Sequence, residues 1–236
     1  STLSFSIIGK PNEECFKPQV DESLRKVYYN HDFAEKVDDT MSVIIPKGAL
    51  YESIAMKMCA SDIIPKADST IKILSPAYLV HDDNTPLQKS IGIVFTHNVE
   101  KNLQRQTVVA RVNSNGWVSY VGGTYRYNRI AARTTVFGTF CLVADLAAPV
   151  ISPSFKDGGD YRSSDKISFR VWDNFSGVAS YDVWIDGEWT PVEFARNRSV
   201  INLKAEGIKG GKSHKIMIKA KDSCGNIASW EGSFIK

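Results

Sequence analysis

The chain of 236 residues is long enough for one large domain or for two domains of about 100 residues each. With 43% hydrophobic and 23% charged residues, it is too apolar for a disordered tail. Its net charge of +3 comes from Lys and Arg scattered among Asp and Glu, which argues against a nucleic-acid-binding protein. No apolar run reaches about 18 residues, so we expect no membrane-spanning helix.

Residues 1–40 give weak structural signals. Residues 3–8 alternate between apolar and polar side chains, which predicts a strand that ends at Gly9-Lys10-Pro11. Residues 11–39 are polar, and a short helix around residues 22–29 is the strongest local pattern. We interpret residues 1–40 as an N-terminal strand with a connecting segment, and the chain as a piece of a longer protein.

From Met41 onward, apolar residues recur with period two and turn signals follow about every 8 to 12 residues, which is typical of antiparallel β-sandwiches. We expect a first sandwich over residues 41–148. Ser114-Asn115-Gly116 predicts a hairpin with positive φ at both Asn115 and Gly116. The expected strands are residues 41–45, 54–59, 71–74, 90–95, 107–113, 117–121, 129–132 and 138–144.

Residues 145–149 form a short linker, because Pro149 cannot donate a hydrogen bond to a sheet. Residues 149–236 contain seven predicted strands, as in an immunoglobulin-like or fibronectin-III-like sandwich. Asp186-Gly187 predicts a type I′ hairpin within it. The expected strands are residues 150–155, 166–172, 178–185, 188–194, 199–203, 212–221 and 227–235. The predicted fold class is therefore all-β, with two antiparallel sandwiches in tandem.

The four cysteines, Cys15, Cys59, Cys141 and Cys224, lie far apart and include no C-x-x-C pair. This spacing argues against zinc-ribbon and thioredoxin-like sites. Cys59 and Cys141 occur in apolar, strand-like segments, so we favour buried free thiols. A disulfide remains the alternative.

The sequence contains no recognisable catalytic pattern. His31, His81, His97 and His214 lie far apart, and H-x-H, H-E-x-x-H and H-x-x-x-D motifs are absent. There is no G-x-S-x-G elbow and no glycine-rich phosphate loop. We therefore expect no catalytic residue, no metal site and no cofactor in this chain.

Acidic turns are the residues best suited to bind calcium through oxygen atoms. None matches the twelve-residue calcium loop, so we favour the explanation that Asp and Asn side chains cap tight turns. The candidates are Asp82, Asp83 and Asn84; Asp157 and Asp160; Asp173 and Asn174; and Asp222 and Asn226.

Five aromatic residues are the candidates for ligand binding. Tyr120, Tyr125 and Tyr127 surround a pair of glycines, and Trp184 lies close to Trp189 in the sequence. Exposed rings could form a platform for carbohydrate or peptide. Core packing is the alternative role for each ring.

Two motifs in the first half carry a resemblance to a known family. Residues 42–51, with the sequence SVIIPKGALY, resemble the opening of the ZU-type β-sandwich of ankyrin-like and netrin-receptor-like proteins. Residues 137–140 (FGTF), together with Asp145 and Pro149, resemble the exit from that domain.

The second half carries another resemblance. Residues 173–178 (DNFSGV), 185–189 (IDGEW) and 222–226 (DSCGN), with His214, resemble the C-terminal region of Gram-negative lysostaphin-type (LytM-like) zinc endopeptidases. In that family the zinc ligands belong to an upstream domain with H-x-x-x-D and H-x-H motifs. Neither motif is present here, so no catalytic residue is carried over.

This second resemblance implies an exported parent protein, in the periplasm or at the cell surface, that cuts peptidoglycan cross-links. The chain would then be a non-catalytic accessory module that positions the parent enzyme or binds it at peptidoglycan. Its implied partners are the parent peptidase domain and peptidoglycan or a cell-envelope protein. The alternative is a protein-interaction or adhesion module of a cell-surface protein, acting through a sheet edge or aromatic patch.

Overall fold

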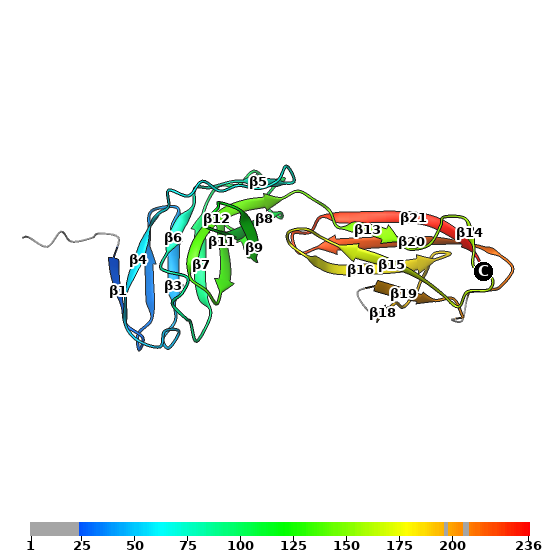
Figure 1. Ribbon diagram of the computed structural model, residues 1–236. Coiled ribbons are helices and arrows are strands. Elements are labelled where there is room, and N and C mark those ends of the chain that lie inside the picture. Colours follow the sequence, from blue (N-terminus) through cyan, green and yellow to red (C-terminus); the bar gives the residue numbers. More distant parts are fainter. Residues whose placement is uncertain (1–23, 196–197, 205–207) are drawn as a thin grey trace, which may run out of the picture.

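The computed structural model describes residues 24–195, 198–204 and 208–236. Within these residues every regular element is a β-strand. The strands form four sheets, which pair into two sandwiches that lie end to end (Figure 1). The prediction of an all-β chain with tandem sandwiches is confirmed. The strand predicted at residues 3–8 and Cys15 lie outside the described residues. None of the described segments is a helix capable of crossing a membrane.

The first sandwich packs a sheet of order β1-β4-β6-β12-β8-β9, with β5 also paired to β12, against a sheet of order β10-β11-β7-β3-β2. Its strands are β1 (Leu24–Val27), β2 (Phe33–Lys36), β3 (Met41–Ile45), β4 (Ile54–Ala60), β5 (Ile71–Ile73), β6 (Tyr78–Val80), β7 (Ile91–Thr96), β8 (Thr107–Val112), β9 (Val118–Gly122), β10 (Thr124–Arg126), β11 (Arg129–Thr134) and β12 (Gly138–Asp145).

The second sandwich packs a sheet of order β13-β15-β19-β18 against a sheet of order β14-β21-β20-β16-β17. Its strands are β13 (Val150–Pro153), β14 (Gly159–Asp160), β15 (Lys166–Trp172), β16 (Val178–Ile185), β17 (Glu188–Trp189), β18 (Glu193–Ala195), β19 (Arg198–Asn202), β20 (Ser213–Asp222) and β21 (Ile227–Ile235). All neighbouring strands are antiparallel except β14 and β21.

The first sandwich begins before Met41, where the sequence pattern placed its start. The helix predicted around residues 22–29 is wrong over Leu24–Val27, which form β1 and pair with β4 from Leu24 opposite Lys57 to Val27 opposite Ile54. Val27 is fully buried in the core. Pairing with a neighbouring strand thus outweighs the weak helical pattern of this short segment.

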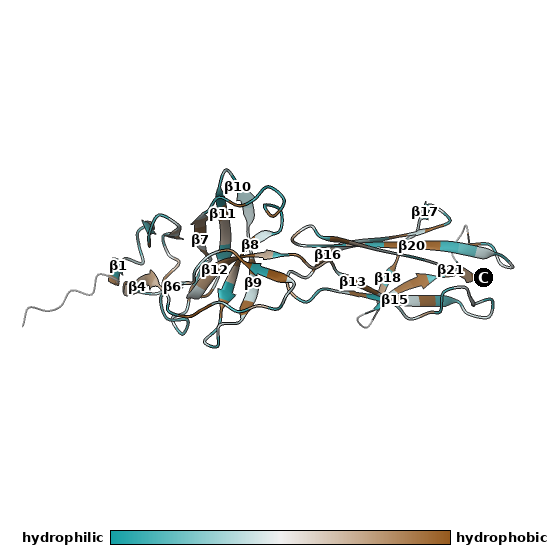
Figure 2. Cartoon of the chain, turned by 90° about the horizontal axis from the view of Figure 1, so that it is seen from above, coloured by the Kyte–Doolittle hydropathy of each residue, from teal (hydrophilic) through white to brown (hydrophobic). Residues whose placement is uncertain are grey.

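Each sandwich has its own apolar core, and a third cluster lies between the sandwiches. All eight residues of β12 are buried, because one face of this strand points into the first core and the other into the third cluster. Cys141 and Val143 of β12 contact that third cluster, as does Cys224 of the second sandwich. Figure 2 shows the two sandwiches from above, with the junction at β8, β9 and β16. The second sandwich therefore covers apolar surface of the first.

Two hairpins test the turn predictions. Asp186 and Gly187 both have positive φ, at 52° and 88°, which confirms the predicted type I′ geometry. The hairpin between β8 and β9 is also confirmed, but only Gly116 has positive φ, at 90°. Asn113 Oδ1 accepts a hydrogen bond from Asn115 N at 2.9 Å and holds Asn115 in an ordinary turn conformation. The prediction of positive φ at Asn115 is therefore wrong.

The cysteines in the described part of the chain are free thiols, and the prediction of a buried free thiol is confirmed for Cys141 but not for Cys59. Cys141 and Cys224 are buried, and Cys59 is partly exposed. Burial raises the pKa of the Cys141 thiol to about 12. Cys141 and Cys224 pack as small apolar groups in the third cluster.

Candidate functional site

His214 is the one buried histidine among the described residues, and both of its ring nitrogens have partners. Its Nδ1 lies 2.7 Å from Asp186 Oδ2, and its Nε2 lies 2.9 Å from the backbone oxygen of Lys209. The ring stacks on Phe234 with centroids 5.4 Å apart. These contacts fix the β16–β17 hairpin against β20. In the described ranges no histidine belongs to a cluster of three or more side chains that could hold a metal.

A row of side chains crosses the outer face of the second sandwich. Trp189 lies directly opposite Trp184, Trp184 opposite Met217, and Met217 opposite Glu231, so β17, β16, β20 and β21 each contribute one residue. Directly opposed residues project from the same face of a sheet. Because the two neighbours of Trp184 in β16, Val183 and Ile185, are buried in the core, this row faces outward. We call Trp189, Trp184, Met217 and Glu231 the aromatic row.

Polar contacts hold the two tryptophans of the aromatic row in place. Trp189 is 61% exposed, and its Nε1 donates a hydrogen bond to Asp182 Oδ1 at 3.1 Å. Lys219 Nζ lies 5.7 Å from the ring centroid of Trp184, which is cation–π distance. A groove of about 460 Å³ runs along the row from Trp184 to Glu231. The row therefore combines fixed aromatic surface with charged groups of both signs.

The three candidate tyrosines lie in different places. Tyr120 is on β9, where it packs edge to face on Phe175 of the second sandwich with ring centroids 5.9 Å apart. Tyr125 is on β10 of the facing sheet, and its hydroxyl donates a hydrogen bond to Asn128 Oδ1 at 2.8 Å. Tyr127 is 96% exposed in the turn after β10. The structure does not gather these rings on one face.

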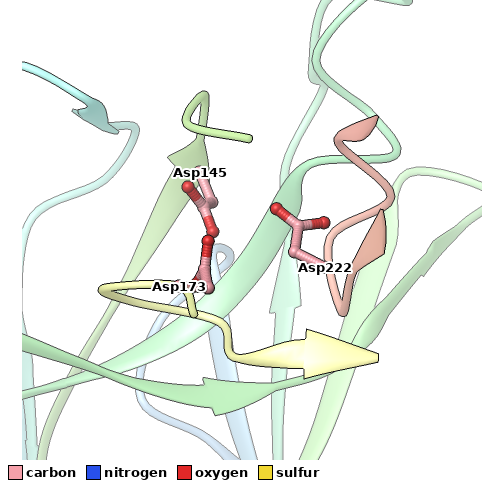
Figure 3. Close-up of side chains that lie close together, drawn as sticks. All are labelled: Asp145, Asp173 and Asp222. Atoms are coloured by element: carbon pink, nitrogen blue, oxygen red, sulfur yellow. The ribbon is translucent and has the colours of Figure 1, made fainter. Parts of the chain in front are cut away.

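Three carboxyl groups meet where the two sandwiches join. Asp145 is the last residue of β12, Asp173 follows β15, and Asp222 is the last residue of β20. One carboxylate oxygen from each lies within 4.8 Å of the other two. Figure 3 shows Asp145 and Asp173 tip to tip, with Asp222 facing them. We call Asp145, Asp173 and Asp222 the junction carboxylates.

Each junction carboxylate uses its Oδ1 atom to shape its own turn, in the way that the sequence pattern predicts. Asp145 Oδ1 accepts a hydrogen bond from Ala147 N at 3.2 Å, Asp173 Oδ1 accepts from Phe175 N at 3.0 Å and Gly177 N at 2.8 Å, and Asp222 Oδ1 accepts from Asn226 N at 2.7 Å. The second oxygen has no hydrogen-bond partner in Asp145 and Asp173, whereas Asp222 Oδ2 accepts a hydrogen bond from Asn226 Nδ2 at 2.7 Å.

Burial raises the pKa of Asp145 above its ordinary value, and the negative charges of Asp173 and Asp222 raise it further. The Ser176 hydroxyl and the Ala147 N–H partly offset this rise. The junction is therefore an electrostatically unfavourable place for a bare carboxylate.

Comparison with known proteins bears on the first sandwich. The family model of the Zu5-like domain matches residues 25–145, which is more than half of the chain. The chain belongs to the Zu5-like domain family. The match begins within β1 and ends at Asp145, one of the junction carboxylates.

No curated protein matches the chain. Among solved structures, one similar chain is described as "Structures of Clostridium thermocellum CbhA fibronectin(III)-like modules", with 13% sequence identity and a TM-score of 0.30. The similarity covers 62% of this chain and 85% of that one. A TM-score this low supports no conclusion about function. The Zu5-like domain and the following sandwich are all-β modules of a kind suited to accessory or interaction roles.

Sequence reasoning identified Asp173 and Asp222 only as members of separate turns, and it associated Asp145 with the end of the ZU-type domain. Their meeting depends on how the Zu5-like domain docks on the second sandwich, which no local pattern encodes. The signal that could have found them is that each of the three Asp residues directly follows a predicted strand.

Proposed function

We propose that the chain is a non-catalytic accessory module that positions an exported cell-wall hydrolase at peptidoglycan. The observation that carries the proposal is the aromatic row on the second sandwich. Indole faces stack on the apolar faces of sugar rings, and charged groups beside them can pair with the polar groups of a glycan or its peptide stems. Glu231 at one end of the row, with Lys219 over Trp184, supplies such groups.

The resemblance of residues 173–178 and 222–226 to the C-terminal region of LytM-like endopeptidases supports the finer part of the proposal. Under it, the parent carries its zinc peptidase domain elsewhere in the protein and acts in the periplasm or at the cell surface. The partners of this chain would be that peptidase domain and peptidoglycan. The chain itself would contribute binding and placement.

Co-sedimentation with purified peptidoglycan tests the proposal. The wild-type chain should pellet with the sacculi, and Trp184→Ala should weaken binding by roughly 30-fold, the effect of losing about 2 kcal/mol at a binding hot spot. Trp117→Ala is the matched control, because Trp117 is an exposed tryptophan of the first sandwich outside the aromatic row. Wild-type protein that stays wholly in the supernatant would remove the binding role.

The alternative, a protein-interaction module, is favoured by Phe194. This residue is 72% exposed and belongs to β18, the edge strand of its sheet. Exposed edge strands accept extended peptides. Digesting the sacculi with protease before the assay separates the two functions. If the chain no longer binds once the wall-linked proteins are removed, and if binding depends on Phe194 rather than Trp184, the alternative is favoured.

A further inference from the structure

We propose that the junction carboxylates form a calcium site that joins the two sandwiches. This inference is independent of the proposed function, because the site lies away from the aromatic row. It concerns Asp145 of the Zu5-like domain and Asp173 and Asp222 of the second sandwich (Figure 3).

The spacing of the oxygens suits a single bound cation. Calcium binds oxygen ligands at about 2.3–2.6 Å, so two oxygens on one ion are at most about 5 Å apart. One carboxylate oxygen from each of the three residues lies within 4.8 Å of the other two. One ion could therefore contact all three groups without a large movement of the backbone.

The second, independent observation is a set of buried oxygens without hydrogen-bond partners. Asp145 is 0% exposed, and no group lies in hydrogen-bonding geometry to its Oδ2. Ser176 is 5% exposed, and its Oγ lies near enough to Asp145 to lower the pKa of that residue but is not in hydrogen-bonding geometry with any described group. The Ser176 hydroxyl lies beside the Asp145 carboxyl group. Asp173 Oδ2 and Gln106 Oε1 are the other such atoms in the described ranges. Asp173 is itself a junction carboxylate, and Gln106 donates a hydrogen bond to Asn226 across the junction. Unpartnered buried oxygens are costly, and a cation would satisfy them.

Among the described residues, no Lys, Arg or His side chain is paired with the junction carboxylates. Buried charges in proteins are normally paired or bound to a metal. A cation bound from solution would therefore neutralise the three negative charges at the junction.

The donor set favours calcium over other metals. Carboxylate, hydroxyl and amide oxygens are hard ligands that suit Ca²⁺ or Mg²⁺, whereas Zn²⁺ prefers His and Cys. Mg²⁺ usually keeps several waters and uses one or two carboxylates. Three carboxylates from three separate segments, with the Ser176 hydroxyl beside Asp145, provide the larger and more flexible ligand set of calcium.

Calorimetric titration of CaCl2 into the full chain, stripped with EDTA and dialysed, tests the proposal. We expect about one Ca²⁺ per chain, no comparable heat with MgCl2, and a melting temperature that rises by about 5 °C or more at 100-fold excess over Kd. Asp173→Asn and Asp222→Asn should abolish the response. Asp82→Asn, which alters an exposed acidic turn of the first sandwich, should keep it.

The melting temperatures of the metal-free variants give a second test, in which the substitution is expected to stabilise the chain. Without calcium, Asp173→Asn removes one of three crowded negative charges, so its melting temperature should exceed that of the metal-free wild type. Ser176→Ala removes a hydroxyl that is not in hydrogen-bonding geometry with any described group, so the chain should fold and bind calcium roughly tenfold more weakly. A wild-type chain with no binding heat and an unchanged melting temperature in millimolar CaCl2 would overturn the proposal, as would an undiminished response in both Asp variants.

Discussion

The side-chain amide of Asn226 donates a hydrogen bond to the backbone oxygen of Asp145 at 2.9 Å and so ties the second sandwich to the last residue of the Zu5-like domain. The same Nδ2 donates to Asp222 Oδ2 at 2.7 Å, and Asn226 Oδ1 accepts from Gln106 Nε2 at 3.3 Å. One side chain thus links both sandwiches and orients a junction carboxylate. Neither Asp nor Leu could reproduce this pattern, because only a side-chain amide both donates and accepts here.

Asn226→Ala should therefore loosen the junction. It leaves the buried Asp145 oxygen and the Gln106 amide without their partner, so we expect a loss of about 1–3 kcal/mol in the free energy of unfolding. Urea denaturation measures this loss, and limited proteolysis of residues 145–149 should become faster. Asn84→Ala is the control, because Asn84 bonds only within its own exposed turn, to Asp82 Oδ1 at 2.8 Å. Equal urea midpoints for the two variants would contradict the assigned role of Asn226.

Two strands of seven and eight residues could be predicted to the residue, whereas the bounds predicted for β4 and β20 differ from the structure by one residue at one or both ends. β15 (Lys166–Trp172) and β16 (Val178–Ile185) were placed correctly because a half-buried strand imposes period two on its side chains. β6 (Tyr78–Val80) was missed, because three residues are too few to establish a period. It exists because its neighbours β4 and β12 both pair with it. Such pairing is a tertiary effect that the local sequence does not report.

The same distinction applies to the candidate sites. Trp184 and Trp189 could be paired from the sequence, because a two-residue hairpin fixes the register of its strands. The approach of the three junction carboxylates could not be predicted from the sequence, because the role of each Asp in its own turn is enough to explain its presence. Their approach depends on the apolar contact between the sandwiches, in which Tyr120 packs on Phe175.

Phe140→Ala tests the core of the Zu5-like domain. Phe140 is fully buried on β12, so its truncation should reduce the free energy of unfolding by about 3–5 kcal/mol. Phe194→Ala is the matched control, because that ring is 72% exposed, and it should change stability by less than about 0.5 kcal/mol. Both values come from urea denaturation. Similar losses in the two variants would mean that β12 is not at the centre of the core.

The free thiols should differ in reactivity in the native protein. The thiolate is the reactive form, and burial raises the pKa of Cys141 to about 12, so it should resist alkylation at about pH 8. Cys59 is partly exposed and should react first. Mass spectrometry of a Cys15→Ser chain treated with iodoacetamide measures this order, and urea should expose Cys141 to the reagent. Alkylation of Cys141 as fast as Cys59 without denaturant would contradict the buried position of Cys141.

Asp160 and Arg162 should contribute to the acid dependence of stability. Arg162 Nε donates to Asp160 Oδ1 at 3.1 Å and to Oδ2 at 3.0 Å, and these hydrogen bonds lower the pKa of Asp160 to about 2 from an ordinary 3.8. Because the folded-state pKa is the lower one, the stabilisation is complete above about pH 5 and is lost as the pH falls through about 2. Asp160→Asn should therefore melt below the wild type at about pH 5, with the difference disappearing near pH 2. Arg162→Gln should give the same profile, and the double variant should add nothing further. A difference in melting temperature that stays constant from pH 5 to about pH 2 would show that the hydrogen bonds of Arg162 do not control the ionisation of Asp160.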